Sequence, residues 1–158
     1  CVVCMVGATA FAAFGLDDSI KNFFNIYDNK SQQTAEKLTT NVESSAESNG
    51  IKLDLTQTIG DQSGFYAVID ASGVKDVPYT LTFRNTDLSI TGKDGAKYDY
   101  TADDIDSSAV DNGITKFPLL VSGVNREGED VNINGSHIVL SLQNIGYRNE
   151  HNKFVTLQ

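Results

Sequence analysis

Several residue types are missing or scarce in this chain, and each absence excludes a class of protein. The 158 residues contain no tryptophan, two prolines, two histidines and two cysteines. Both cysteines, Cys1 and Cys4, lie in the opening run, so the rest of the chain has no disulfide framework and no cysteine-based metal site. Basic residues are also few, because 12 Lys and Arg stand against 21 Asp and Glu, a net charge of -9. This balance argues against nucleic acid or an anionic membrane surface as the main partner.

Motifs that assemble a catalytic centre are missing as well. The sequence has no nucleophile elbow, no H-E-x-x-H helix, no G-x-G-x-x-G turn and no Walker loop. We predict that His137 lies on the outward face of a strand and that His151 lies in a polar turn, both at the surface. We therefore expect no enzyme activity and no bound cofactor.

Charge is absent from the opening run, Cys1 to Leu16, which meets two acidic residues at Asp17 and Asp18. A helix that spans a bilayer needs about 20 apolar residues. The run is shorter than that and rich in small residues, so we interpret residues 1–16 as the outer part of a truncated transmembrane helix. A buried helix of a soluble domain is the alternative that its length allows.

The two cysteines suggest two other interpretations of the opening run. Redox chemistry at a C-x-x-C pair needs a thiolate beside polar or cationic groups, whereas Cys4 has apolar neighbours. A lipid-bearing Cys1 would normally precede a polar tether, and here more apolar residues follow. We therefore favour small apolar residues of a helix as the role of both cysteines.

Residues 17–48 are predicted to form a juxtamembrane helical segment. An acidic N-cap precedes apolar residues at helical spacing, namely Ile20, Phe23, Phe24 and Tyr27. The stretch from Ser31 to Ser48 is polar, with apolar residues three or four apart at Ala35, Leu38, Val42 and Ala46. This spacing favours a second, weaker helix, and a solvated linker is the alternative.

From residue 49 onward apolar and polar residues alternate, which is typical of strands with one face on a core. Residues 51–59 and 65–70 are predicted to form a hairpin around the turn 60–64. Further strands are expected at 79–84, 88–90, 98–100, 114–124, 131–133, 138–142 and 154–157. The sequence thus predicts a mainly β fold, in which one or two N-terminal helices precede an antiparallel β-sandwich at residues 49–158.

Four features in this order carry a resemblance to a known family: the apolar run that ends at Leu16, the segment Ile20–Asn25, the strand start Asn49–Leu55, and the return strand at Gly64–Tyr66. Together they resemble the extracytoplasmic domain of unknown function that follows the single membrane helix of Gram-positive anti-sigma-factor-like proteins. The resemblance implies an immunoglobulin-like sandwich outside the membrane and no catalytic residues. It also implies a sigma-factor-binding segment on the cytoplasmic side, upstream of Cys1.

These observations lead us to expect a non-catalytic binding or sensing domain of a single-pass cell-membrane protein, with residues 17–158 extracytoplasmic. Its partner would be a protein or a cell-wall ligand, and residues 1–27 would mediate any homo-oligomer. The alternative is a structural surface or pilin-like subunit. A pilin helix would carry glutamate at position 5, where this chain has Met5.

One acidic segment contains candidate calcium ligands, Asp103, Asp104, Asp106 and Asp111. Calcium prefers six to eight oxygen ligands, which carboxylates and loop carbonyls can supply. The spacing of these residues does not match an EF-hand loop, and Asp is common in solvated loops. We favour a solvated loop over a calcium site.

Overall fold

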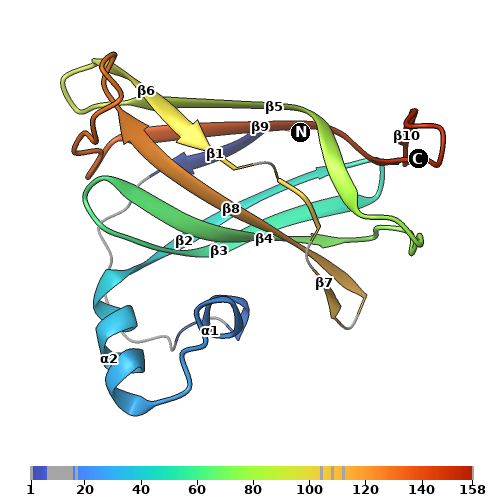
Figure 1. Ribbon diagram of the computed structural model, residues 1–158, viewed down its shortest axis with the longest axis horizontal. Coiled ribbons are helices and arrows are strands. Elements are labelled where there is room, and N and C mark those ends of the chain that lie inside the picture. Colours follow the sequence, from blue (N-terminus) through green and yellow to red (C-terminus); the bar gives the residue numbers. More distant parts are fainter. Residues whose placement is uncertain are drawn as a thin grey trace.

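A computed structural model describes residues 2–6, 16, 18–103, 105–107, 109–111 and 113–157 of the chain. The helices are α1 (Asp18–Phe24) and α2 (Asn29–Leu38). The strands are β1 (Val2–Val6), β2 (Thr39–Ser48), β3 (Ile51–Gly60), β4 (Gly64–Ser72), β5 (Leu81–Thr91), β6 (Lys97–Ala102), β7 (Ala109–Asp111), β8 (Ile114–Val124), β9 (His137–Arg148) and β10 (Phe154–Thr156). The fold is mainly β, as the alternating pattern predicted (Figure 1).

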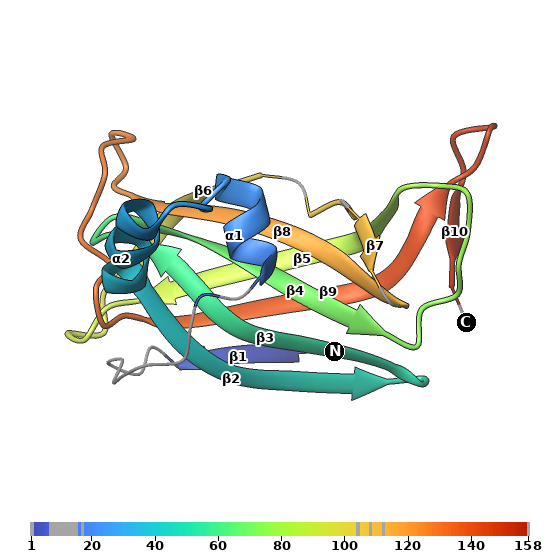
Figure 2. The same ribbon diagram turned by 90° about the horizontal axis from the view of Figure 1, so that it is seen from below.

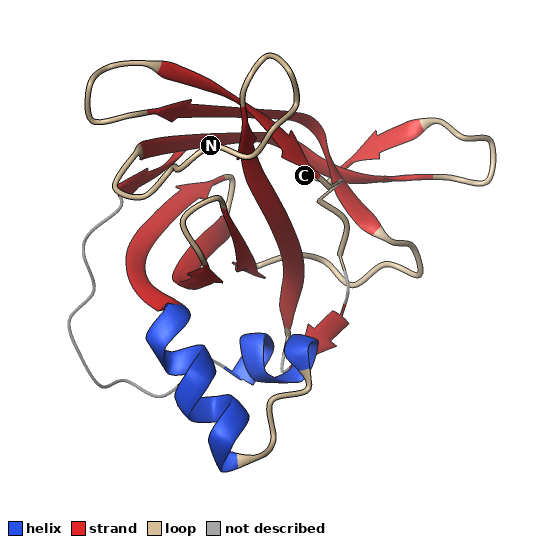
Figure 3. Cartoon of the chain, turned by 60° about the vertical axis from the view of Figure 1, so that its left-hand side comes forward, coloured by secondary structure: helices blue, strands red, loops and turns tan. Residues whose placement is uncertain are grey.

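The described strands form one antiparallel sheet of ten strands, in the order β1-β9-β5-β6-β8-β4-β3-β2, with β10 added to β9 and β7 added to β8. The sheet curls on itself, so that its halves face each other across the core (Figure 3). Strand β6 pairs with both β5 and β8 and joins the two halves. The immunoglobulin-like arrangement of strands stays a prediction.

The main core lies between the two halves of the curled sheet. Along β8 every second residue points inward, and Phe117, Leu119 and Val121 are at most 1% exposed. Leu140 and Leu142 of β9 face them from the opposite half and are just as buried. Burial of each such side chain contributes about 1.5–3 kcal/mol, so this alternation stabilises the curled sheet.

The opening run differs from the helix that we predicted. Val2–Val6 form β1, which pairs antiparallel with β9 from Val2 opposite Ser141 to Val6 opposite His137. Valine is β-branched and fits a pleated strand better than a helix, and the strand VVCMV contains three valines. Residues 7–15 lie outside the described residues, and the membrane helix as a whole stays a prediction. None of the helices in the described part of the chain reaches the length and apolarity needed to cross a membrane.

The second predicted helix ends ten residues before Ser48, because Thr39–Ser48 form β2 rather than helix. A hairpin turn at Asn49 and Gly50 joins β2 to β3. Both turn residues have positive φ, 52° and 76°, as in the two-residue type I′ turn that matches the twist of paired strands. Val42 and Ala46 therefore lie in a strand despite their helical spacing from Leu38, because β-branched residues and this turn favour β2.

Most of the remaining strands lie where the sequence predicted them. The hairpin of β3 and β4 forms as expected, whereas the two strands predicted at 79–84 and 88–90 are one continuous strand, β5. Residues 131–133 form a loop instead of a strand. Its backbone is held at two points, since the Val131 N–H donates to the Gly123 carbonyl at 3.0 Å and the Ile133 N–H to the Gln62 carbonyl at 2.7 Å.

Candidate functional site

The two helices pack on the outer face of β3 and β4 and bury a second, smaller cluster there (Figure 1). Alternate residues of β4 face opposite sides, so Ala67 and Ile69 join the main core while Tyr66 and Val68 contact the helices. The cluster consists of Leu16, Ile20, Ile26, Ala35, Ile59, Tyr66 and Val68. The β3–β4 pair is thus covered on both faces.

Local capping fixes where α2 begins. Asp28 is its N-cap, and its carboxylate accepts hydrogen bonds from the backbone N–H groups of Lys30 at 3.0 Å and Ser31 at 2.9 Å. The Ser31 side chain also donates to Asp28, and these bonds hold the pKa of the carboxyl below its usual value. The cap therefore fixes the first turn of α2.

A second carboxylate shapes the turn between β3 and β4. Asp61 accepts from the Ser63 N–H at 2.8 Å, the Ser63 hydroxyl at 2.9 Å and the Gly64 N–H at 3.2 Å. The backbone and hydroxyl bonds from Ser63, followed by that from Gly64, lower the pKa of Asp61. The turn is therefore held by its own side chain, beside the open end of the helical layer.

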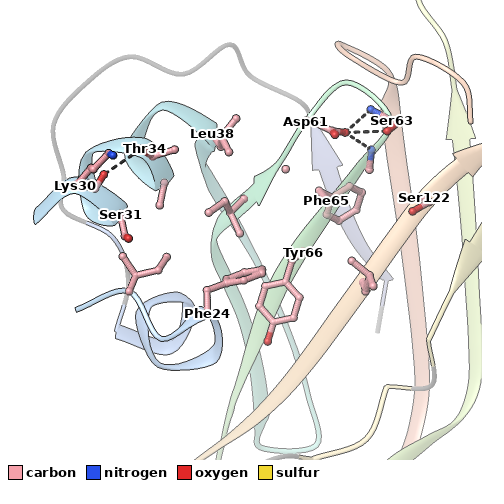
Figure 4. Close-up of a pocket in the computed structure, with 16 residues that line it drawn as sticks. Phe24, Lys30, Ser31, Thr34, Leu38, Asp61, Ser63, Phe65, Tyr66 and Ser122 are labelled. Atoms are coloured by element: carbon pink, nitrogen blue, oxygen red, sulfur yellow. Dashed lines mark hydrogen bonds between the residues drawn. The ribbon is translucent and has the colours of Figure 1, made fainter. Parts of the chain in front are cut away.

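The helices leave part of the outer sheet face uncovered, and this gap is a groove of about 730 Å³. We call it the helix–sheet groove, and its principal apolar residues are Phe24, Leu38, Phe65 and Tyr66 (Figure 4), together with Leu120. They come from α1, α2, β4 and β8. Ligand-binding clefts commonly have volumes of about 300–1,000 Å³, so the groove has the size of a small-molecule site.

Three large apolar side chains line the groove and are exposed: Phe24 is 43%, Leu38 46% and Leu120 47% exposed. Tyr66 lies beneath them and is buried, and its ring contacts the ring of Phe24 (Figure 4). Burial raises the pKa of the Tyr66 hydroxyl to about 12. The groove thus has exposed apolar sides and a buried aromatic floor.

Besides Tyr66, six residues with polar or charged side chains line the helix–sheet groove: Lys30, Ser31, Thr34, Asp61, Ser63 and Ser122. Thr34, Asp61 and Ser63 make hydrogen bonds with structural roles. The Thr34 hydroxyl donates to the Lys30 carbonyl at 3.0 Å, and the Ser63 hydroxyl is bonded to Asp61. Lys30 supplies a cation at the groove.

The candidate calcium ligands are placed only in part. Asp103 and Asp106 are exposed, Asp111 is the last residue of β7, and Asp104 lies outside the described residues. Among the side chains that the structure describes, no three carboxylate, histidine or cysteine groups lie close enough to hold a metal ion. The solvated loop therefore stays the prediction for this segment, with a calcium site as the alternative.

The acidic segment does have a packing role. Ile105 is 4% exposed and joins the main core. The Leu81 N–H donates to the Ser107 hydroxyl at 2.8 Å, and the Ser107 N–H donates to the Leu81 carbonyl at 2.7 Å. These bonds tie the segment to β5.

The two histidines, His137 and His151, are exposed as predicted.

Comparison with known proteins gives no relative. No protein-family model, no curated protein and no solved structure matches the chain. The site must therefore be interpreted from its own geometry.

The helix–sheet groove is not predicted from the sequence, although two features of the sequence are consistent with it. The aromatic stripe of α1 needs an apolar surface to pack against. Strand β8 contains four consecutive apolar residues, Pro118, Leu119, Leu120 and Val121, so apolar side chains lie on both of its faces. Such a run is typical of a strand that is covered on both faces. Leu120 is the residue on the outer face that remains exposed in the groove.

Proposed function

We propose that this protein is a non-catalytic binding domain that takes the apolar part of a small ligand into the helix–sheet groove. The observation that carries the proposal is the convergence of three exposed apolar side chains, Phe24, Leu38 and Leu120, in one cleft. Large apolar side chains gathered on a surface mark interaction sites more often than single exposed ones. A ligand that covers them gains the free energy of their burial.

The charge of the protein indicates how many anionic groups the ligand can carry. The chain carries a net charge of -9, and the charged residues that line the groove are one cation, Lys30, and one anion, Asp61, whose carboxylate is already bonded to Ser63 and Gly64. A ligand with one anionic group next to an aromatic or aliphatic body would place that group near the Lys30 ammonium. Several anionic groups would be repelled by the rest of the protein.

The sequence adds a location to this proposal. The resemblance described above supports an extracytoplasmic domain of a single-pass membrane protein, in which ligand binding would be sensed by a partner, and a membrane helix at residues 1–16 would require Val2–Val6 to leave β1. The immunoglobulin-like arrangement, the membrane attachment and the anti-sigma-factor-like role belong to this wider proposal. Ligand binding in the groove depends on none of them.

A fluorescence titration tests the proposal. The dye anilinonaphthalene sulfonate has an aromatic body and one anionic group, so it matches the chemistry of the groove. We expect Leu120→Ser to weaken dye binding several-fold, up to about tenfold, because an apolar contact is lost. Tyr100→Ser is the matched control, since Tyr100 is 38% exposed and lies outside the groove-lining residues. Equal binding by both variants would count against the proposal.

A further inference from the structure

Strand β9 has a gap along one of its two edges. Strand β5 occupies the other edge and pairs with β9 over residues 137–147. On the edge with the gap, β1 pairs with residues 137–141 and lies beside β2, and β10 pairs with residues 146–148 at the far end (Figure 2). Among the described strands, none pairs with residues 142–145 on this edge.

A cavity of about 250 Å³ lies at this gap, and we call it the edge cavity. Its floor is apolar and belongs to the main core, with Leu53, Phe83, Leu142 and Ile145 among its residues. The ring of Phe83 is 9% exposed and packs against the ring of Phe117, with centroids 4.9 Å apart. Clefts for drug-sized ligands commonly have volumes of about 300–1,000 Å³, so the edge cavity suits a more compact ligand.

The rim of the edge cavity is polar. Its hydrogen-bonding side chains are all exposed, and they are Ser48, Asn49, Gln143, Asn144 and Thr156. Within the part of the chain that the structure describes, none of these side chains is hydrogen-bonded to another protein group. Amide and hydroxyl groups both donate and accept hydrogen bonds, so the rim can bind a ligand that does the same.

The edge cavity is also uncharged. None of the described residues that line it is charged, although the chain has 12 Lys and Arg and 21 Asp and Glu. A charged ligand would lose water on entering the cavity and would meet no side chain of opposite charge there. The lining therefore favours a neutral ligand.

The backbone at Asn144 shapes both the floor and the rim. Its φ is +57° within β9, a conformation that asparagine tolerates better than most residues. In a regularly alternating strand Leu142 and Ile145 would face opposite sides, yet both are buried in the main core. The change of direction at Asn144 thus leaves Gln143 and Asn144 adjacent at the rim. Non-glycine residues with such a φ cluster at ligand-binding sites.

The two ends of the gap are closed, because β1 and β10 occupy β9 on either side of it. One backbone group of the gap is also used, since the Leu157 N–H donates to the Ile145 carbonyl at 2.9 Å. A peptide that adds to a sheet edge needs a run of free backbone groups along that edge. The gap therefore suits a compact molecule better than an added strand.

We propose that the edge cavity binds one ring of an uncharged sugar. The hydroxyl groups around a pyranose ring donate and accept hydrogen bonds, as the side chains of the rim do. The C–H groups on the face of the ring are apolar, so they can cover Phe83 and its neighbours in the floor. The edge cavity shares no lining residue with the helix–sheet groove, and the inference is independent of the ligand proposed there.

Two-dimensional NMR of the full chain tests the inference with four neutral probes, namely glucose, galactose, mannose and N-acetylglucosamine. The side-chain amide groups of Asn49, Gln143 and Asn144 are observed directly in such spectra. We expect at least one of the four sugars to shift these signals saturably, with a Kd of about 1–10 mM for so small a ligand. Glucuronate, an anionic sugar with the same ring, should bind several-fold more weakly than glucose, because no cation lines the described cavity.

Asn144→Gly is the main variant, since glycine keeps the positive φ while the side-chain amide is lost. We expect it to raise the Kd about three- to tenfold through the lost hydrogen bond. Asn152→Gly is the matched control, because Asn152 has φ of +56°, is exposed and lies outside the cavity lining. It should leave the Kd unchanged. Gln143→Ala, at an exposed side chain of the rim, should also weaken binding.

Three results would overturn the inference. Absence of a saturable shift at the edge cavity with all four sugars would show that it takes no neutral sugar ring. Equal affinities of Asn144→Gly and Asn152→Gly would show that the Asn144 amide does not contact the sugar. Binding of glucuronate as tight as that of glucose would contradict a site that selects neutral ligands.

Discussion

The ring of Phe24 stands edge-on to the ring of Tyr66, with centroids 5.0 Å apart and planes at 80°. This contact joins the end of α1 to the outer face of β4. It also places a half-exposed ring above a buried one, which gives the helix–sheet groove an aromatic floor. Docking of the helices and formation of the candidate site thus depend on the same pair of residues.

The first prediction concerns this aromatic pair. Phe24→Ala removes the ring contact and part of the apolar burial, so we expect the free energy of unfolding to fall by about 1–2 kcal/mol. Urea denaturation measures the change. Tyr27→Ala is the control, because Tyr27 is 72% exposed in the same helical region and its loss should alter stability by less than about 0.5 kcal/mol. Equal losses in both variants would contradict a specific role for the contact.

The second prediction concerns the pH dependence of stability. The pKa of Tyr66 is raised to about 12 in the folded chain, against 10.0 for an ordinary tyrosine. Well below pH 10 the Tyr66 phenol is neutral in the folded and the unfolded chain, so its ionisation does not change the free energy of unfolding. Between pH 10 and pH 12 the phenol ionises in the unfolded chain before it ionises in the folded chain. At pH 11 this difference lowers the free energy of unfolding by about 1.4 kcal/mol.

Tyr66→Phe tests the assignment, because phenylalanine cannot ionise. Denaturant titrations of both proteins from pH 9 to pH 11 should show a smaller loss of stability in the variant, by about 1.4 kcal/mol. Parallel losses in the two proteins would mean that Tyr66 ionises as readily folded as unfolded.

The third prediction concerns the β2–β3 hairpin. Gly50 has φ of +76° and open space around its Cα, so a methyl group would meet no neighbour. Gly50→Ala should therefore cost about 1–2 kcal/mol through backbone strain alone. Asn49→Gly keeps the freedom for positive φ and should change stability by less than about 0.5 kcal/mol. Thermal unfolding of the two variants compares them, and an unchanged midpoint for Gly50→Ala would rule out the type I′ turn.

The fourth prediction concerns the outer face of the sheet, where Asp54 and Asp70 stand directly opposite each other in the β3–β4 ladder. Like charges in such positions repel. Lys116 compensates for Asp70, since its ammonium donates to the carboxylate at 2.8 Å and the two side chains are only 18% and 24% exposed. Lys116→Met should lower stability by about 1–2 kcal/mol.

The bridge between Lys52 and Asp54 provides the comparison. It has the same 2.8 Å separation but is more exposed, at 49% and 32%, so Lys52→Met should cost less than about 0.5 kcal/mol. High salt should reduce the smaller effect further. A larger loss of stability for Lys52→Met than for Lys116→Met would contradict the expectation that the more buried ion pair contributes more.

The strands could be predicted where alternation reflects one buried and one exposed face. Strand β8 was predicted at 114–124 and has those bounds, because its inward residues form the centre of the core. Strand β2 was not predicted, since its apolar residues are too sparse to show a period of two. Its hairpin partner and the Asn49–Gly50 turn determine its conformation, whereas the sequence pattern predicts helix up to residue 48 and the first strand after it.

The candidate site was harder to predict because it is a tertiary feature. Phe24, Leu38 and Leu120 are far apart in the sequence, and each alone is an ordinary apolar residue of a helix or strand. Only the docking of α1 and α2 on β3 and β4, next to β8, brings them into one groove. For the same reason β1 was assigned to a helix, since an apolar run does not show whether a sheet edge will receive it.

Mapping of a bound ligand by two-dimensional NMR tests the central claim most directly. Anilinonaphthalene sulfonate is titrated into isotope-labelled protein, and the shift of each backbone amide is followed. We predict saturable shifts concentrated at the groove residues Phe24, Leu38, Tyr66 and Leu120, which all weaken in the Leu120→Ser variant. Shifts centred on another part of the surface, or no saturable shift at all, would contradict the claim that the helix–sheet groove is the binding site.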